Sequence, residues 1–186
     1  MTKNPNSAEN FSRVQAREII VLAHNIRSIH NIGAIFRSCE GFGISKIILS
    51  GYSPFPKIEN ENYQKTGRLP YLAEKIDSAI HKTALGAEKI VPFEVSENIL
   101  DTIKNLKQNG FRIAALEQSL NSIKLPNFSV EKDAKIALLL GEEVDGISEN
   151  LIEKCDFTLE IPMFGEKESF NVSVAAGIAL YKVACE

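Results

Sequence analysis

The sequence predicts an α/β fold, a mostly parallel β-sheet flanked by helices. Two observations support this fold class: short apolar runs recur along the chain, and stretches with the apolar spacing of amphipathic helices separate them. Strands that alternate with helices form crossover units, so the runs should lie side by side in a buried parallel sheet. The segments predicted as strands are residues 19–23, 46–50, 89–93, 111–116, 135–140 and 157–161.

The helix predictions rest on apolar residues spaced three or four apart. The clearest helix should end at Gly110, because glycine favours the turn that follows a helix. Its apolar residues are Ile99, Leu100, Ile103 and Leu106. A second helix should follow Asn31 as its N-cap and leave Arg37 pointing away from the core. The buried face of that helix should hold Ile32, Ile35, Phe36 and Cys39.

We expect a single domain over residues 16–186, preceded by a loose tail at residues 1–15. Two irregular connections should lie inside this domain. Residues 52–70 contain three prolines and should form a long mobile loop, of the kind that is usually functional or disordered. Residues 121–133 should form the second irregular connection.

The composition is that of a globular cytosolic protein. Of the 186 residues 44% are hydrophobic and 24% are charged, and no apolar run approaches the roughly 20 residues that span a bilayer. The first residues are too polar for a secretory signal, so a cytoplasmic location is expected. The three cysteines and three histidines lack the spacing of metal ligands. This predicts reduced, mostly buried thiols and no metal site.

Charge is distributed unevenly along the chain. The formal net charge of −3 argues against a protein that binds nucleic acid through bulk charge alone. Residues 1–70 nevertheless hold nine Lys and Arg against five Asp and Glu. This basic end is a candidate for phosphate contact, and solvated surface charge without such a role is the alternative.

Three glycine-containing segments are candidates for a nucleotide-binding loop. Residues 41–43 fail the dinucleotide fingerprint, because Lys46 stands where the third glycine belongs, and they are typical of a helix C-terminal turn. Residues 141–148 nearly match the phosphate-binding P-loop, but Ile147 replaces its lysine and three carboxylates would repel a triphosphate. That loop suits a cationic or neutral ligand. Residues 161–177 leave a strand, turn and begin a helix of small residues, which an ordinary β-turn-α connection also explains.

Taken together and in this order, three segments resemble the SpoU or TrmH family of RNA ribose methyltransferases, in the SPOUT superfamily. The first family motif is similar to residues 31–37, which begin with Asn31 and end with Arg37. The second is similar to residues 141–146, with Glu143 as its acid, and the third to residues 161–163 and 169–173. Two residues depart from the family pattern: Phe170 stands where leucine is common, and Glu142 where a small polar residue is usual.

The resemblance implies a mostly parallel sheet whose last strands and helix form a deep trefoil knot, an exception to the rule against threading. It also implies a homodimer in which the arginine of one protomer reaches the cofactor pocket of the other. The implied cofactor is S-adenosylmethionine, held by backbone groups and apolar walls. The implied cofactor-binding residues are Leu116, Gly141, Ile161, Met163, Ser169 and Phe170.

The resemblance assigns the central catalytic role to Arg37. A general base and an electrostatic stabiliser are the two alternatives, and the second asks less of the residue. A guanidinium with a pKa of about 12.5–13.8 is neutral at pH 7 about once in a million, which costs about 8 kcal/mol. The other implied catalytic residues are Asn31, Glu143, Ser169 and Asn171. Helix capping is the structural alternative for Asn31, Ser169 and Asn171.

The function that the resemblance implies is S-adenosylmethionine-dependent methylation of a ribose 2′-hydroxyl in RNA, with no metal and no membrane. Transfer RNA is the favoured substrate, because the short segment before residue 19 leaves no room for a separate RNA-binding domain. The alternatives are a ribosomal RNA 2′-O-methyltransferase and a knotted RNA-binding protein that has lost catalysis. A small-molecule enzyme of Rossmann type is disfavoured by the missing third glycine.

Overall fold

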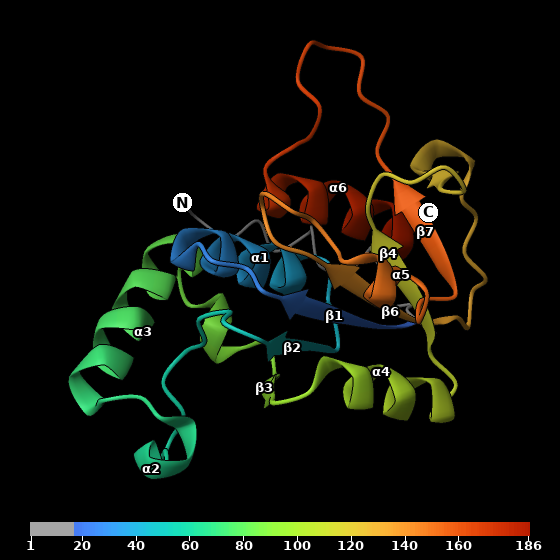
Figure 1. The fold of residues 1–186 in the computed structure, drawn as a ribbon. Coiled ribbons are helices and arrows are strands. Elements are labelled where there is room, and N and C mark those ends of the chain that lie inside the picture. Colours follow the sequence, from blue (N-terminus) through green and yellow to red (C-terminus); the bar gives the residue numbers. More distant parts are fainter. Residues whose placement is uncertain (1–16) are drawn as a thin grey trace, which may run out of the picture.

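The computed structural model describes residues 17–186, which form one seven-stranded sheet with helices on both of its faces (Figure 1). The strand order is β3-β2-β1-β6-β4-β7-β5, and each neighbouring pair is parallel. The predicted α/β fold class is therefore confirmed. The strands are β1 Glu18–His24, β2 Lys46–Ser50, β3 Phe93–Ser96, β4 Arg112–Leu116, β5 Ile123–Lys124, β6 Lys135–Leu140 and β7 Phe157–Glu160.

The helices form two layers, one on each face of the sheet. α1, α3 and α6 contribute buried residues to one apolar cluster, and α4 and α5 contribute to the cluster on the opposite face. Figure 1 shows α1 and α6 above the sheet and α4 below it. The helices are α1 Ile29–Gly41, α2 Tyr63–Thr66, α3 Pro70–Ala84, α4 Ile99–Gln108, α5 Glu149–Ile152 and α6 Val172–Cys185.

Strand β1 shows why the central runs are apolar at every position. Ile19 and Val21 belong to the cluster under α1 and α6, whereas Ile20 and Leu22 belong to the cluster under α4. Successive side chains of a strand point to opposite faces, so a strand that is covered on both faces needs apolar residues without alternation. This burial is the physical origin of the apolar runs in the sequence.

The strand predicted at residues 89–93 is wrong in position, because the strand here, β3, begins at Phe93. Residues Ala87–Lys89 form a 3₁₀ turn instead. Pro92 has no backbone N–H to donate to a ladder and contributes only its carbonyl oxygen, which accepts from the Ile47 N–H at 2.9 Å. The apolar run therefore leads up to the strand and only its last residue lies within it.

Helix α1 differs from the prediction at its start and agrees with it at its end. Its N-cap is Ser28 and not Asn31, because the Ser28 side chain accepts a hydrogen bond from the Asn31 backbone N–H. Asn31 thus lies inside the first turn, and its side chain is free to bond elsewhere. The predicted end of the helix is confirmed: α1 ends at Gly41, and Gly43 has a φ of 65° in the following turn.

Both segments predicted as irregular contain regular structure. Within residues 52–70 lies the one-turn helix α2, and Arg68 forms a bidentate ion pair with Glu61 whose side chains are 9% and 0% exposed. The Arg68 guanidinium also lies 3.7 Å from the centre of the Phe55 ring. Residues 121–133 contain β5 and a 3₁₀ turn. The buried Arg68–Glu61 ion pair holds part of this long polar segment in place. An ion pair leaves no periodic pattern in the sequence, so the prediction could not include it.

Some expectations concern residues outside the described range or single side chains. The expected tail at residues 1–15, and residue 16 at the start of the expected domain, lie outside the described residues. The three cysteines are free, and Cys39 is buried, but Cys185 is exposed, which corrects the expectation of mostly buried thiols. Within residues 17–186, no helix is both long enough and apolar enough to cross a membrane.

Replacement of Gly33 should test how closely α1 approaches α3. A Cβ added at Gly33 would lie 2.1 Å from Thr83 Oγ1 and 2.4 Å from the Ile80 carbonyl oxygen. Gly33→Ala should therefore lower the free energy of unfolding by about 1–3 kcal/mol, as overpacked cores do. Urea unfolding at equilibrium measures this. Gly41→Ala is the matched control, because no atom lies within 4 Å of its added Cβ, and equal losses for the two variants would contradict the close approach.

Candidate functional site

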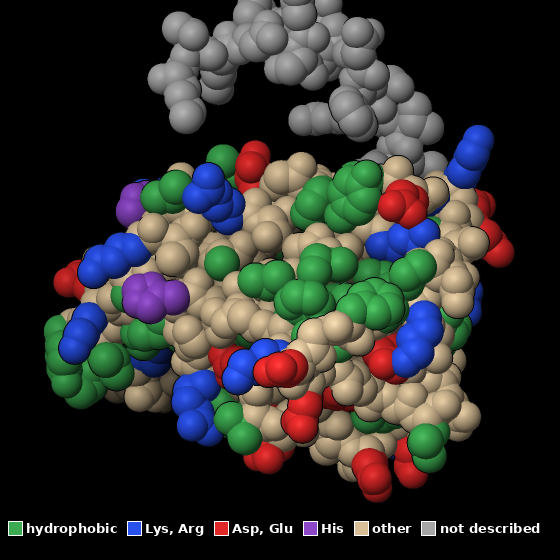
Figure 2. Space-filling model, turned by 90° about the horizontal axis from the view of Figure 1, so that it is seen from above, with side chains coloured by type: hydrophobic (Ala, Val, Ile, Leu, Met, Phe, Trp, Pro, Cys, Tyr) green, Lys and Arg blue, Asp and Glu red, His purple; other side chains and the backbone are tan. Residues whose placement is uncertain are grey.

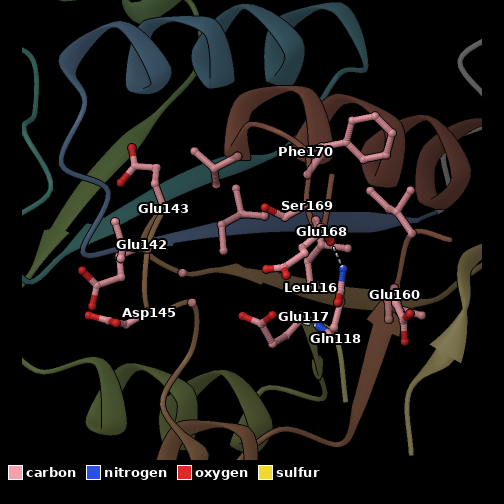
Figure 3. A pocket seen from close by; sticks show the side chains of 18 of the residues that line it. Leu116, Glu117, Gln118, Glu142, Glu143, Asp145, Glu160, Glu168, Ser169 and Phe170 are labelled. Carbon is pink, nitrogen blue, oxygen red and sulfur yellow. Dashed lines mark hydrogen bonds between the residues drawn. The ribbon is translucent and has the colours of Figure 1, made fainter. Parts of the chain in front are cut away.

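A cavity of about 290 Å³ opens at the carboxyl ends of β4, β6 and β7 (Figure 3). Ligands bind at this edge in open parallel sheets, because the loops that leave the strands gather there. The walls come mainly from residues 116–118, 140–146 and 159–170. We call residues 141–148 the first pocket loop and residues 161–171 the second pocket loop.

Two glycines of the first pocket loop allow its backbone to fold back on itself. Glu142 and Gly146 form an isolated antiparallel bridge, in which the Glu142 N–H donates to the Gly146 carbonyl oxygen at 3.2 Å. A Cβ at Gly141 would lie 2.5 Å from that same oxygen. Gly146 has a φ of 66°, in the left-handed region that favours glycine. Side chains at these positions would open the turn that forms one wall of the pocket.

The Glu143 carboxylate ties the first pocket loop to the start of helix α1. It accepts a hydrogen bond from the Asn31 side-chain amide at 2.8 Å, and from the backbone N–H groups of Arg27 and Ser28 at 3.3 Å each. Partial burial raises the pKa of Glu143, but these donors outweigh burial and leave the pKa below its ordinary value. An ionised carboxylate at this position also suits the positive end of the helix dipole.

The same amide of Asn31 continues the chain of hydrogen bonds into the third motif. Asn31 Oδ1 accepts from the Asn171 side-chain amide at 3.2 Å, and Asn171 Oδ1 accepts from the Ser173 N–H at 2.9 Å. Asn171 is the N-cap of α6, which agrees with the structural alternative for this residue. Three segments that are far apart in sequence therefore meet in one hydrogen-bonded chain, Glu143–Asn31–Asn171–Ser173.

The pocket brings together each residue predicted to bind the cofactor, although their roles stay predictions. These residues are Leu116, Gly141, Ile161, Met163, Ser169 and Phe170. Of the residues predicted to be catalytic, Glu143 and Ser169 line the pocket, while Asn31 and Asn171 reach it through Glu143. Ser169 is not a helix cap, since Asn171 occupies that position.

Arg37 does not join the other predicted catalytic residues within one chain. It lies on the exposed side of α1, as the apolar spacing of that helix predicts, and it is not among the residues that line the pocket. Among the described residues it has neither an ion pair nor a hydrogen bond through its side chain. The catalytic role of Arg37 stays a prediction.

Sequence reasoning found three carboxylates in the first pocket loop and missed the three that the other walls of the pocket contribute. Among the described residues that line it there is no Lys, Arg or His. The lining carboxylates are those of Glu117, Glu142, Glu143, Asp145, Glu160 and Glu168. Such a lining favours a ligand that carries positive charge and disfavours a phosphate. Glu117 directly follows the strand predicted at residues 111–116, and Glu160 is the penultimate residue of the strand predicted at residues 157–161, so their places near strand ends were the available signal.

Glu142, one of the departures from the family pattern, has its own partners outside the pocket. The Tyr52 hydroxyl donates a hydrogen bond to its carboxylate. Burial lowers the pKa of the neighbouring His24, and the charge of Glu142 opposes that shift in part. His24 also shares a 2.8 Å hydrogen bond with the Ser50 hydroxyl. Glu142 stands where the family pattern has a small polar residue, and Tyr52, on the loop that follows β2, is its hydrogen-bond donor.

Across residues 17–186, His, Cys, Asp and Glu side chains do not form a group of three that could hold a metal ion. The carboxylates of Glu117 and Glu143 accept hydrogen bonds from backbone N–H groups, and that of Glu143 also accepts one from a side-chain amide.

The fold and the site together define an α/β protein with a ligand pocket at the carboxyl ends of its parallel strands. Two loops form this pocket, and a series of hydrogen bonds links the segments beside it. Residues 68–181 match the model of the SpoU rRNA Methylase family. The matched segment exceeds half of the chain, and the chain belongs to this family. The resemblance seen in the three motifs is therefore confirmed.

Known relatives agree with this assignment. A putative TrmH family tRNA/rRNA methyltransferase of Staphylococcus aureus (strain COL) is 30% identical over 164 residues, which is 88% of this chain and 57% of the relative. The tRNA (guanosine(18)-2'-O)-methyltransferase of Aquifex aeolicus (strain VF5) is 30% identical over 166 residues, 89% of this chain and 68% of that protein. The chain thus spans little more than half the length of the staphylococcal relative.

A solved structure has the same fold. The AdoMet-bound rRNA methyltransferase from Sinorhizobium meliloti superposes with a TM-score of 0.71 at 22% identity. The match covers 89% of this chain and 55% of that one. At this identity the likeness establishes the fold alone.

Acid titration should reveal the contribution of Glu143. The folded-state pKa lies below the unfolded value of about 4.3, so the stabilisation is full above that pH and is lost as the pH falls through the folded-state pKa. Glu143→Gln should unfold at lower urea concentration than wild type near pH 7, and the difference should shrink below about pH 4. Asp145→Asn, at a carboxylate without a hydrogen bond to the described residues, is the control and should unfold close to the wild-type urea concentration at pH 7. Parallel pH curves for wild type and Glu143→Gln would contradict the assignment.

Proposed function

We propose that this chain is an S-adenosylmethionine-dependent RNA methyltransferase that modifies a ribose 2′-hydroxyl. The observation that carries the proposal is the chain Glu143–Asn31–Asn171–Ser173, which joins the three family motifs beside an acidic pocket. Family membership supports the reaction class, and the name of the Aquifex relative supports the 2′-oxygen as acceptor.

The residues of the pocket fit S-adenosylmethionine. When bound, this cofactor supplies an activated methyl group on a positively charged sulfur. Apolar side chains of Leu116, Ile161 and Met163 would hold its adenosine and the carbons next to its sulfur, while backbone groups of the pocket loops would orient its polar ends. The surrounding carboxylates favour the sulfonium charge. The Sinorhizobium rRNA methyltransferase was solved with the same cofactor, AdoMet, bound to it.

Arg37 is proposed to act on the substrate from a second copy of the chain. Its guanidinium would bind the phosphate next to the target ribose and stabilise negative charge that develops on the 2′-oxygen as the proton leaves. This role needs no deprotonation of the arginine. Glu143, Asn31 and Asn171 would hold the start of α1 and the start of α6 in fixed relation, so that ribose and cofactor are aligned.

A homodimer is supported by the outer face of α6. This helix is apolar on nearly all sides, which is typical of a buried helix, yet Val174 is 49% and Tyr181 53% exposed. Hydrophobic side chains gather in the middle of the face seen in Figure 2, the view from above onto the layer of α1 and α6. We propose that a second copy covers this face and brings its Arg37 to the pocket.

The proposal includes the family's deep trefoil knot and a cytoplasmic tRNA substrate. Strand β6 lies between β1 and β4, two strands that precede it in the sequence. Its insertion between them supports a threaded C-terminal segment. The Aquifex relative is named for tRNA, which favours tRNA, whereas the Sinorhizobium protein is named for rRNA. Ribosomal RNA is therefore the second candidate substrate, and a knotted RNA-binding protein without catalysis is the remaining alternative.

Replacement of Arg37 should separate catalysis from cofactor binding. Arg37→Ala should lower transfer of tritium from labelled S-adenosylmethionine into RNA by about 10²–10³-fold, as loss of a donor to a developing oxyanion does. Cofactor affinity in calorimetry should stay unchanged. Total tRNA and rRNA are assayed separately, and nucleoside mapping identifies the methylated position. Lys75→Ala, which removes an exposed positive charge on α3, is the control.

The outcomes separate the alternatives. Label on a tRNA ribose that disappears in Arg37→Ala supports the proposal in full. Label confined to rRNA moves the substrate and keeps the chemistry. Cofactor binding without label in either RNA pool favours the protein that has lost catalysis.

Charge placed on α6 should dissociate the proposed dimer. Ile178→Asp introduces a carboxylate on the exposed apolar face of this helix, and the buried charge would cost more than a close-packed interface returns. Sedimentation velocity should show a dimer for wild type and a monomer for the variant. Leu100→Asp, at a partly exposed leucine on α4, should remain dimeric. A wild-type protein that sediments as a monomer would refute the dimer.

A further inference from the structure

Two consecutive residues that follow β4, Glu117 and Gln118, contact different pocket loops. The Glu117 backbone N–H donates to the Leu159 carbonyl oxygen at 2.9 Å, so this segment is anchored to β7 as well as to β4. Both side chains lie at the pocket, between the two loops (Figure 3). Neither residue belongs to the three motifs.

The Glu117 carboxylate holds the end of the first pocket loop. Its Oε2 accepts a hydrogen bond from the Ile147 N–H at 2.9 Å. The same oxygen packs against Gly146, where an added Cβ would lie only 2.2 Å away. Because the Ile147 side chain is buried in the core under α4, this single contact connects the loop, the carboxylate and the core.

Gln118 holds the second pocket loop. Its side-chain amide donates to the Glu168 carbonyl oxygen, shown as the dashed line in Figure 3, and Glu168 directly precedes two residues of the pocket wall, Ser169 and Phe170. The Gln118 backbone N–H donates to Glu117 Oε1 at 2.9 Å. The two side chains therefore form one unit, with one loop on each side.

We infer that Glu117 and Gln118 are positioning residues that hold both pocket loops in their cofactor-binding arrangement before the cofactor arrives. This inference rests on the proposed function, because it takes the cofactor to be S-adenosylmethionine. A loop that is not held must be ordered when the ligand binds, and that loss of entropy weakens affinity. The competing explanation is that the Glu117 charge attracts the sulfonium directly.

Calorimetric titration with two ligands separates these explanations. S-adenosylhomocysteine lacks the methyl group and the sulfonium charge but otherwise has the same shape. Loss of loop positioning should weaken both ligands equally, whereas loss of an attracting charge should weaken S-adenosylmethionine alone. Glu117→Ala should raise the Kd of both ligands about tenfold, the upper range for one lost hydrogen bond. Glu117→Gln, which keeps an acceptor for the Ile147 N–H, should restore most of that affinity.

Asp145→Asn is the matched charge control, because it removes a carboxylate from the same pocket lining without a hydrogen bond to the described residues. It should change the two affinities less than Glu117→Ala does. Unchanged affinity in Glu117→Ala would overturn the inference. A loss of affinity in Glu117→Ala that is confined to S-adenosylmethionine would also overturn it. So would a loss of S-adenosylmethionine affinity in Asp145→Asn as large as that in Glu117→Ala.

Amide hydrogen exchange of the ligand-free protein supplies a readout that does not depend on activity. Exchange in residues 141–148 should be faster in Glu117→Ala, and exchange in residues 161–171 faster in Gln118→Ala, while Asp145→Asn should match wild type. Unchanged exchange in both variants would refute the positioning role. If Glu117→Ala fails to fold in urea titration, Gln118→Ala carries the test, since its side chain is exposed.

The results also distinguish this inference from the proposed function. Wild-type protein that binds both ligands and methylates no RNA would remove the proposed reaction and leave the positioning role to be judged by the affinities and the exchange rates. Wild-type protein that binds neither ligand would overturn both. With active protein, KM for the cofactor should rise in Glu117→Ala while kcat at saturation stays within a few-fold of wild type.

Discussion

The arrangement of the site depends on the contact between the Glu143 carboxylate and the start of helix α1. Two backbone N–H groups and the Asn31 amide converge on that carboxylate, where the helix dipole also favours negative charge. Since Asn31 bonds onward to Asn171, the N-cap of α6, one anion fixes the first pocket loop and two helix starts at once. Without it the first pocket loop would lose its three hydrogen bonds to the start of α1.

Charge divides the site into two parts with different needs. The pocket is lined by carboxylates and suits a cationic cofactor, but the proposed substrate is a polyanion. Arg37, the positive group of the first motif, lies on the exposed side of α1 and outside that lining. A dimer resolves the conflict in the proposed mechanism, because the acidic pocket of one chain would hold the cofactor while the arginine of the other would bind the RNA.

Close packing explains the glycines at several positions of the described chain. Gly33 lets α1 approach the Ile80 carbonyl of α3, and Gly146 leaves room for the Glu117 carboxylate. These requirements are invisible in the sequence, where Gly146 fits the spacing of a nucleotide loop and Gly33 fits no backbone signal. The error at residues 89–93 has another origin: Ile90 and Val91 are apolar but precede the strand, and Ile90 is 67% exposed, so apolar character alone did not mark a strand here.

The α/β class, five of the six predicted strand positions and six residues of the pocket wall could be read from the sequence alone, because runs buried on both faces and the three motifs are local patterns. Two features needed the folded structure: Ser28 caps α1, which frees Asn31 to bond to Glu143, and Glu117 and Gln118 contact the two pocket loops. The contacts of Asn31 and Glu117 join residues 112 and 30 positions apart in the chain. Such pairings follow from how β4, β6 and β7 lie side by side, and spacing along the chain does not encode that.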